Sequence, residues 1–110
     1  MATSYKVLGQ VAPTATTNTN IYTVPAGTEA VISTIFVCNR GGTAATYRIA
    51  IRKNGNAISN EHYIAFDPII LANDSIAITV GTTLNAEDVV TVYASTNNLS
   101  FNVFGSEITA

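Results

Sequence analysis

Residues 29–38 read EAVISTIFVC, and this run decides the fold class because it places apolar residues on both faces of a strand. Side chains alternate between the two faces of a strand, and β-branched residues fit its pleated surface. The polar run Asn39–Thr43, with two glycines, then ends the segment as a turn. We predict a central strand covered on both sides. One face would carry Ala30, Ile32, Thr34, Phe36 and Cys38, and the other Val31, Ser33, Ile35 and Val37.

The next segment, Thr46–Lys53, has the cleaner alternation of a strand with one covered face. Apolar residues at 47, 49 and 51 share one face, while Arg48 and Arg52 share the other. Asn54-Gly55 follows at once, and this dipeptide favours a type I′ turn because both of its central residues need a positive φ. The pattern predicts a hairpin whose return strand is Ala57–Phe66.

Strand-like segments of the same kind cover the rest of the chain, and turn residues separate them about every 8–12 positions. No segment of helical length shows a 3.6-residue period. About eight antiparallel strands in a chain of 110 residues predict an all-β fold, a two-sheet sandwich that is jelly-roll-like. The further predicted strands are Tyr5–Gln10, Ile21–Val24, Ile69–Leu71, Ser75–Val80, Asp88–Ala94 and Leu99–Ile108. In the last of them one face carries Leu99, Phe101, Val103 and Gly105.

The chain has the length of a single domain. Residues 1–20 hold the first strand and a Thr/Asn-rich segment, Val11–Asn20, which is either an arm that orders on a neighbour or a surface loop. Residues 21–110 form the β-sandwich. Since Lys and Pro, which usually guard sheet edges, are scarce, we expect neighbouring subunits to cover edges or apolar surface.

The composition excludes several classes of function. Only 11% of the residues are charged, against about 25% in an average chain. The net charge of −2 without a basic run argues against binding nucleic acid through its phosphates. One cysteine and one histidine exclude an internal disulfide and a multi-histidine metal site. No leader or membrane-spanning run of apolar residues stands out, and we expect synthesis in a reducing cytoplasm and no cofactor.

The candidate catalytic residues favour structural interpretations. Glu61 and His62 are adjacent, so in a strand they would point to opposite faces and could not act together. Cys38 ends an apolar strand, which is typical of a buried thiol rather than a nucleophile. Asp74 and Asp88 lie at predicted turns, where Asx side chains bond their own backbone; calcium binding by converging loops is the alternative. We expect no enzyme activity.

The basic residues suggest a partner surface. Arg40, Arg48, Arg52 and Lys53 are four of the five basic residues and lie within fourteen positions. Arginine is enriched in interfaces and pairs with carboxylates, so this cluster is either a contact for an acidic partner or a solvated strand face. We also expect the N-terminal segment Ala2–Asn20 to dock, and we include Tyr5 and Lys6 among the candidate partner-binding residues.

Several segments together resemble small virion proteins of tailed bacteriophages. They lie between about residues 20 and 108 and form a pattern of strands and turns with no catalytic motif. The segments that carry the resemblance are Tyr22–Thr28, Val31–Arg40, Ala72–Ser75, Thr79–Gly81, Asp88–Ser95 and Leu99–Ile108.

The resemblance implies a structural role in the virion. Such proteins often serve as capsid decoration, or cement, proteins that sit outside the shell, commonly as trimers, and bridge capsid subunits. The expected partners are further copies of this chain and the major capsid protein or another virion protein, with no nucleic acid and no membrane. The protein would be assembled in the host cytoplasm and located in the virion, on the capsid exterior or the tail.

The alternative is a tail, neck or fibre component, one version of which binds a host-surface glycan. Sugar sites usually need an aromatic platform, and the chain has no tryptophan. Exposure of Tyr63 or Tyr93 beside Asn and Asp side chains would favour this alternative.

Overall fold

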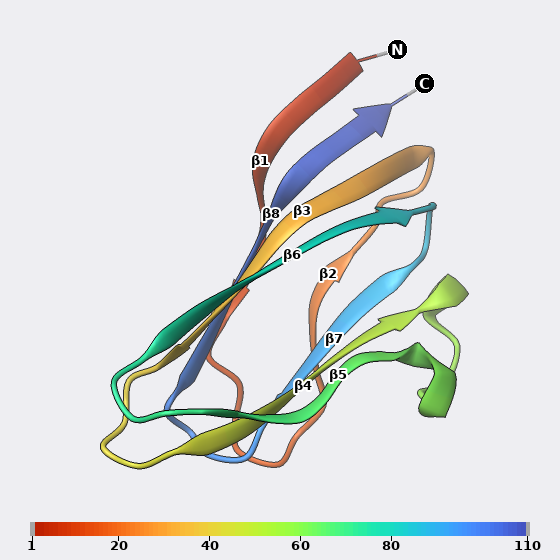
Figure 1. Ribbon diagram of the computed structural model, residues 1–110. Helices are drawn as coiled ribbons and strands as arrows, with labels where there is room; N and C mark the ends of the chain where they lie inside the picture. Colours follow the sequence, from red (N-terminus) through yellow and green to blue (C-terminus); the bar gives the residue numbers. More distant parts are fainter. Residues whose placement is uncertain (1, 110) are drawn as a thin grey trace.

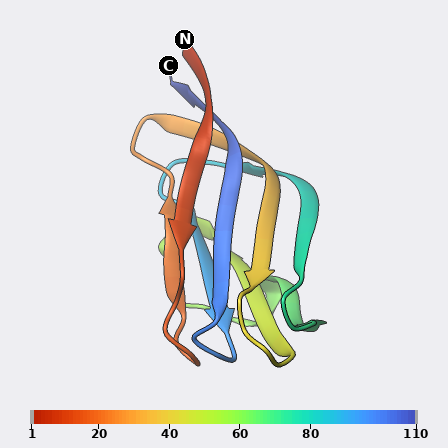
Figure 2. The ribbon, with the colours of Figure 1, turned by 90° about the vertical axis from the view of Figure 1, so that its left-hand side faces the viewer.

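The computed structural model describes residues 2–109, and within them the regular elements are eight strands and two short 3-10 turns. The strands form two antiparallel four-stranded sheets packed face to face, which confirms the predicted all-β sandwich (Figures 1 and 2). Sheet A has the order β1-β8-β3-β6, and sheet B has the order β2-β7-β4-β5. The strands are β1 (Ala2–Val11), β2 (Thr19–Thr23), β3 (Thr28–Asn39), β4 (Ala45–Arg52), β5 (Tyr63–Ile70), β6 (Ser75–Leu84), β7 (Val89–Ala94) and β8 (Leu99–Thr109).

Strand β3 lies between β8 and β6, so the prediction of a central strand is confirmed. The prediction of one unbroken alternation along it is wrong, because a bulge at Ser33 shifts the register on both sides. Ala30 and Ile32 face the core before the bulge, and Ile35 and Val37 face it afterwards. A bulge adds one residue to one strand of a pair and so exchanges its faces.

Bulges cross sheet A at a single level. On β8, Phe104 and Gly105 lie opposite the shift at Ser33 of β3, and Val7 of β1 pairs with the same Phe104 just before its own shift at Leu8. On β6 the irregularity falls beside Gly81, whose φ is +56°. Bulges bend a sheet and increase its twist. Beyond this level the ends of β1 and β8 run side by side past sheet B (Figure 1).

Position 105 requires glycine because the backbone of β3 comes very close to it at the bulge. A Cβ atom there would lie 2.0 Å from the carbonyl oxygen of Val31 on the neighbouring strand. The hydroxyl of Ser33 donates a hydrogen bond of 3.1 Å to the carbonyl of Phe104, which fixes the extra residue in place. The bulge therefore depends on residues from both β3 and β8.

The connection between β4 and β5 differs from the prediction. Asn54 and Gly55 do adopt positive φ angles, 55° and 67°, but within a 3-10 turn at Lys53–Gly55. A second 3-10 turn, Asn60–His62, follows before the chain enters β5 at Tyr63. The predicted return strand Ala57–Phe66 is thus wrong in its first half, and the predicted strand Ile69–Leu71 is mainly the end of β5.

Two side chains explain why this connection is long. The carboxylate of Asp88, next to β7, accepts a 2.9 Å hydrogen bond from the N–H of Asn54 and so holds the first turn against sheet B. The second turn is closed by a capping box, in which the backbone N–H of Ser59 donates to Nδ1 of His62 at 3.1 Å. Long-range and local polar contacts together replace the two-residue hairpin.

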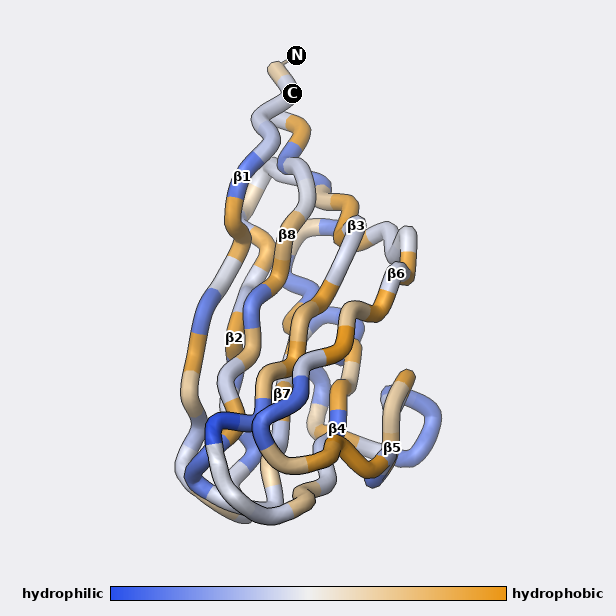
Figure 3. The backbone as a smooth tube through the Cα atoms, turned by 60° about the vertical axis from the view of Figure 1, so that its left-hand side comes forward, coloured by the Kyte–Doolittle hydropathy of each residue, from blue (hydrophilic) through white to orange (hydrophobic). Residues whose placement is uncertain are grey.

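The core lies between the sheets. β8 contributes Leu99, Phe101 and Val103, all fully buried, as the alternation of that strand predicted. The ring of Phe101 packs edge-on against Tyr47 from sheet B, with centroids 6.4 Å apart. Figure 3 shows hydrophobic and hydrophilic residues alternating along the strands, with strongly hydrophilic stretches in the turns at the lower end.

Residues 12–18 connect β1 to β2 across the end of the sandwich. Pro13 is buried, and the N–H of Thr16 donates a 2.8 Å hydrogen bond to the carbonyl of Ala94. The N–H of Ala15 donates to the side-chain oxygen of Asn97 at 2.7 Å. The segment therefore lies on the domain as a loop, and β1 is a hydrogen-bonded strand of sheet A rather than a free arm.

Matched isoleucine substitutions test the core. Ile35→Ala removes a fully buried side chain, so we expect the free energy of unfolding to fall by about 2–5 kcal/mol. Ile69→Ala removes one that is 70% exposed, so we expect a change within about 0.5 kcal/mol. Urea denaturation measures both. Equal losses would contradict the placement of the core.

Candidate functional site

The outer side of sheet B carries a cluster that we call the aromatic–arginine face: Arg48, Tyr63, Phe66, Asp67 and Tyr93. The guanidinium carbon of Arg48 lies 4.2 Å from the ring centre of Phe66 and 4.3 Å from that of Tyr93. The rings of Tyr63 and Phe66 meet edge-on with centroids 4.9 Å apart. Arginine between two rings is stabilised by cation–π attraction. The result is a fixed aromatic platform on three neighbouring strands.

A bulge in β5 completes this face. Asp67 and Pro68 occupy two positions of β5 opposite a single residue of β4, and Asp67 has a φ of +60°. The carboxylate of Asp67 then accepts two hydrogen bonds from Arg48, of 2.7 and 3.1 Å. These bonds raise the pKa of Arg48 and lower the pKa of Asp67. Both groups stay charged, and the pair holds the platform in one geometry.

The basic residues do not form a single free surface. The Arg52 guanidinium donates to the hydroxyl of Thr91, the side-chain oxygen of Asn20 and the carbonyls of Gly55 and Asn56, at 3.0–3.2 Å. Arg52 therefore ties β2, β4 and β7 to the first 3-10 turn.

Arg40 and Lys53 lie apart from this network. Arg40 donates to Ser100 and to the carbonyl of Asn97 at one end of sheet A. Lys53 is exposed at the start of the first 3-10 turn. Three of the four basic residues predicted as a partner surface thus hold the fold together.

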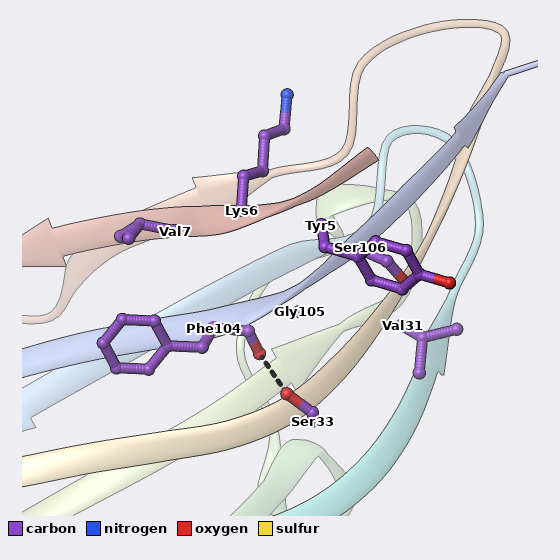
Figure 4. A pocket seen from close by; sticks show the side chains of 8 residues that line it. All are labelled: Tyr5, Lys6, Val7, Val31, Ser33, Phe104, Gly105 and Ser106. Carbon is purple, nitrogen blue, oxygen red and sulfur yellow. Dashed lines mark hydrogen bonds between the residues drawn. The ribbon is translucent and has the colours of Figure 1, made fainter. Parts of the chain in front are cut away.

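Tyr5 and Lys6 lie at a groove on sheet A (Figure 4). The groove has a volume of about 480 Å³ and sits at the level of the bulges, where Val7, Val31 and Phe104 also line it. Tyr5 is 86% exposed, and Val7 is 47% exposed. Residues 5 and 7 of the strand share one face, so Lys6 points to the other. The lining is therefore mainly apolar.

The ammonium of Lys6 pairs with the carboxylate of Glu107 on the adjacent strand. The hydroxyl of Tyr22, from sheet B, donates to the second oxygen of the same carboxylate. The hydrogen bonds from Lys6 and Tyr22 lower the pKa of Glu107, whereas burial and the neighbouring Glu107 raise the pKa of Tyr22. This triad joins the two sheets where β1 and β8 leave the sandwich.

The acid–base candidates occupy structural positions. Glu61 and His62 lie in a 3-10 turn with 4.0 Å between the carboxylate and Nε2, so the prediction that they point apart is wrong. The Nδ1 of His62 accepts a hydrogen bond from the backbone N–H of Ser59.

The carboxylates of Asp74 and Asp88 accept hydrogen bonds from backbone N–H groups of their own turns, as predicted. Cys38 is only half-buried, not buried as predicted, since the bulge turns it away from the core.

Within residues 2–109 no three His, Cys, Asp or Glu side chains gather as they would to hold a metal ion. In the same range no helix has the length and hydropathy needed to span a membrane.

Sequence reasoning missed the outward positions of Phe36 and Phe66. Phe36 stood in a strand whose two faces are both apolar, and no face was predicted for Phe66. Phe36 turns outward because of the bulge at Ser33. No simple sequence signal locates the bulges, although glycine at positions 81 and 105 is compatible with them.

Comparison with known proteins gives no assignment: no protein-family model matches the chain, and no curated protein is similar to it in sequence.

The Lys6–Glu107–Tyr22 triad predicts a pH dependence of stability. Because the folded-state pKa of Glu107 lies below its ordinary value of 4.5, the ionised group stabilises the fold above that pH and loses this contribution as the pH falls through the lowered value. Glu107→Gln should reduce the free energy of unfolding at neutral pH, and the difference from wild type should narrow toward about pH 3.

Urea denaturation across this pH range measures the difference. Glu87→Gln, in the turn before β7, serves as the control and should leave the profile unchanged. If the free energy of unfolding of Glu107→Gln stays below that of the wild type by the same amount at every pH, the role of the carboxylate charge is contradicted.

Proposed function

We propose that this protein is a non-enzymatic structural protein of a phage virion, a homo-oligomeric capsid decoration protein that bridges and stabilises capsid subunits. The observation that carries the proposal is the exposure of large apolar side chains on both outer sides of one small sandwich. Monomers rarely expose large apolar areas unless these serve in binding. The exposed set is Tyr5, Val7 and Phe36 on sheet A, and Ile64, Phe66, Ile69 and Leu71 on or next to β5.

The rigidity of the sandwich supports this role. Arg48 and Arg52 bond within the chain, which leaves the apolar surfaces beside them for association. A protein that binds only the closed shell stabilises the shell by mass action. In a trimer, three weak contacts act together and raise the overall affinity. The resemblance noted above favours three copies, on the capsid exterior, assembled in the host cytoplasm.

Cryo-electron microscopy of particles made with and without this chain tests the proposal. We expect additional density of about the size of this domain at threefold positions of the shell. We also expect particles lacking the protein to release their contents at lower temperature, since a bound ligand contributes to the stability of the assembly. Density confined to the tail, or no density on the particle, would overturn the assignment.

The aromatic–arginine face favours a second candidate, a tail, neck or fibre component that binds a host-surface glycan. Phe66 is 57% exposed, and a recess of about 360 Å³ is lined by Asn60, Tyr63 and Phe66. Aromatic rings offer apolar platforms for sugar rings, while an amide donates to and accepts from sugar hydroxyls and a carboxylate accepts from them. Tyr63 and Tyr93 are only partly exposed, so the exposed ring beside Asn and Asp is that of Phe66 rather than the tyrosine that the sequence analysis named.

A glycan array tests the second candidate. We expect Tyr63→Ala and Phe66→Ala to abolish any binding that the wild-type protein shows, because each removes a ring of the platform. Phe36→Ala removes a ring of similar exposure from the other sheet and should leave binding intact. The absence of wild-type binding, or equal losses in all three variants, would exclude this face as a sugar site.

A further inference from the structure

The outer face of sheet A is distinguished by how few charges it carries. Strand alternation and register place on it Tyr5 and Val7 of β1, Phe104 of β8, and Val31 and Phe36 of β3. Of the described side chains that this register turns outward, only Glu29 is charged, and Arg40, just after β3, adds a guanidinium at one end, where it donates to the outward Ser100. Lys6 and Glu107 point to the opposite side, where they pair with each other.

The outer side of sheet B, in contrast, carries several charged side chains. They include Arg48, Asp67 and Arg52, each held in an internal network. The two faces of one small sandwich therefore differ in charge. Depletion of charge together with enrichment in aromatic residues distinguishes the centre of a protein interface from ordinary surface.

Aromatic side chains occupy the middle of the neutral face. The rings of Phe36 and Phe104 meet edge-on with centroids 5.6 Å apart. Phe36 is 41% exposed, although it is a large apolar side chain at the centre of a four-stranded sheet. The groove at the bulges continues this surface toward Tyr5 (Figure 4). A second apolar layer would cover the pair and fill the groove.

We propose that the outer face of sheet A is the surface through which copies of this chain associate, packing face to face with the same face of other copies. Face-to-face sheets pack about 10 Å apart, which brings aromatic residues of both layers into contact. This inference rests on the homo-oligomeric part of the proposed function and adds the surface that forms the oligomer.

Charge identifies the occupant. A charged partner surface would lose its hydration against this face and find no charge at its centre to compensate it, since Glu29 and Arg40 lie near the two ends of the face. Another copy brings the same neutral surface, so no charge is left unpaired at its centre. The size is sufficient, since the molecule measures 46 × 27 × 19 Å and a stable interface needs only about 800 Å² from each partner.

Light scattering coupled to size-exclusion chromatography tests the proposal on the purified protein. We expect the wild type to have the mass of at least two chains of 11.5 kDa, because one face packed on the same face of another copy is a contact between two chains. Phe36→Lys and Tyr5→Lys should each reduce it to that of a single chain, because they place like charges opposite each other. Tyr5 is 86% exposed, so Tyr5→Lys leaves the fold of the chain unchanged.

Lysine substitutions on β5 are the matched controls. Ile64→Lys and Ile69→Lys replace side chains that are 48% and 70% exposed on the opposite sheet, and both should keep the wild-type mass. A monomeric wild type at micromolar concentration would overturn the proposal. So would a wild-type mass in both sheet A variants, or loss of the oligomer in the β5 variants instead.

Cys38 provides a second measurement without altering the interface. It lies on the same outer face, two residues from Phe36, and is the only thiol in the chain. We expect it to be protected from a thiol reagent in the wild type and to react in Tyr5→Lys. Equal reactivity in both would count against an interface here.

These measurements separate the two proposals. Because they use purified protein, they do not depend on a capsid. Oligomers that form through sheet A but do not bind particles would overturn the proposed function alone. A protein that decorates particles as single chains would overturn the inference about sheet A and the homo-oligomeric part of the proposed function, but not the decoration of the shell.

Discussion

A line of bulges crosses sheet A at the level of Ser33, and the rest of the structure depends on it. The extra residue in β3 exchanges the faces of that strand, so Ile35 and Val37 reach the core while Phe36 and Cys38 turn outward. Gly105 on β8 makes room for the crowded backbone, and Gly81 on β6 supplies the positive φ that its own irregularity uses. The bend lets β1 and β8 continue past sheet B, and the groove lined by Tyr5 and Val7 lies at the same level.

The few charged residues of this chain mostly work within it. Arg48 links two aromatic rings to Asp67, and Arg52 links three strands to a turn. Lys6 pairs with Glu107, which also accepts a hydrogen bond from Tyr22 on the other sheet. Each of these contacts fixes the position of one element relative to another, which the hydrophobic effect alone does not do because it lacks direction. The low charge of the chain therefore has two consequences. It leaves one sheet face neutral, and it gives most of the remaining cations a structural role.

The sequence predicted the architecture because alternation and turn residues are local properties. The apolar alternation in Leu99–Val103 placed that strand correctly against the core, and Asn54-Gly55 was correctly assigned positive φ angles. The return strand was misplaced because Asp88, distant in the sequence, holds the turn at Asn54. Of the candidate partner residues, Tyr5 lies on an exposed surface. Arg40, Arg48 and Arg52 are instead hydrogen-bonded within the chain. The sequence did not indicate this, because closeness in sequence does not reveal hydrogen bonds to distant strands.

The sequence by itself determined that this chain is a β-sandwich with scarce charge, one cysteine and one histidine. Those features follow from residue types and from a period of two, which each segment carries alone. The tertiary structure decided which apolar side chains are core and which are surface. In a strand with two apolar faces, that choice depends on a one-residue shift of register, and register is fixed by neighbouring strands. The neutral face of sheet A, with Phe36 and Phe104 at its centre, exists only once β1, β8, β3 and β6 are aligned.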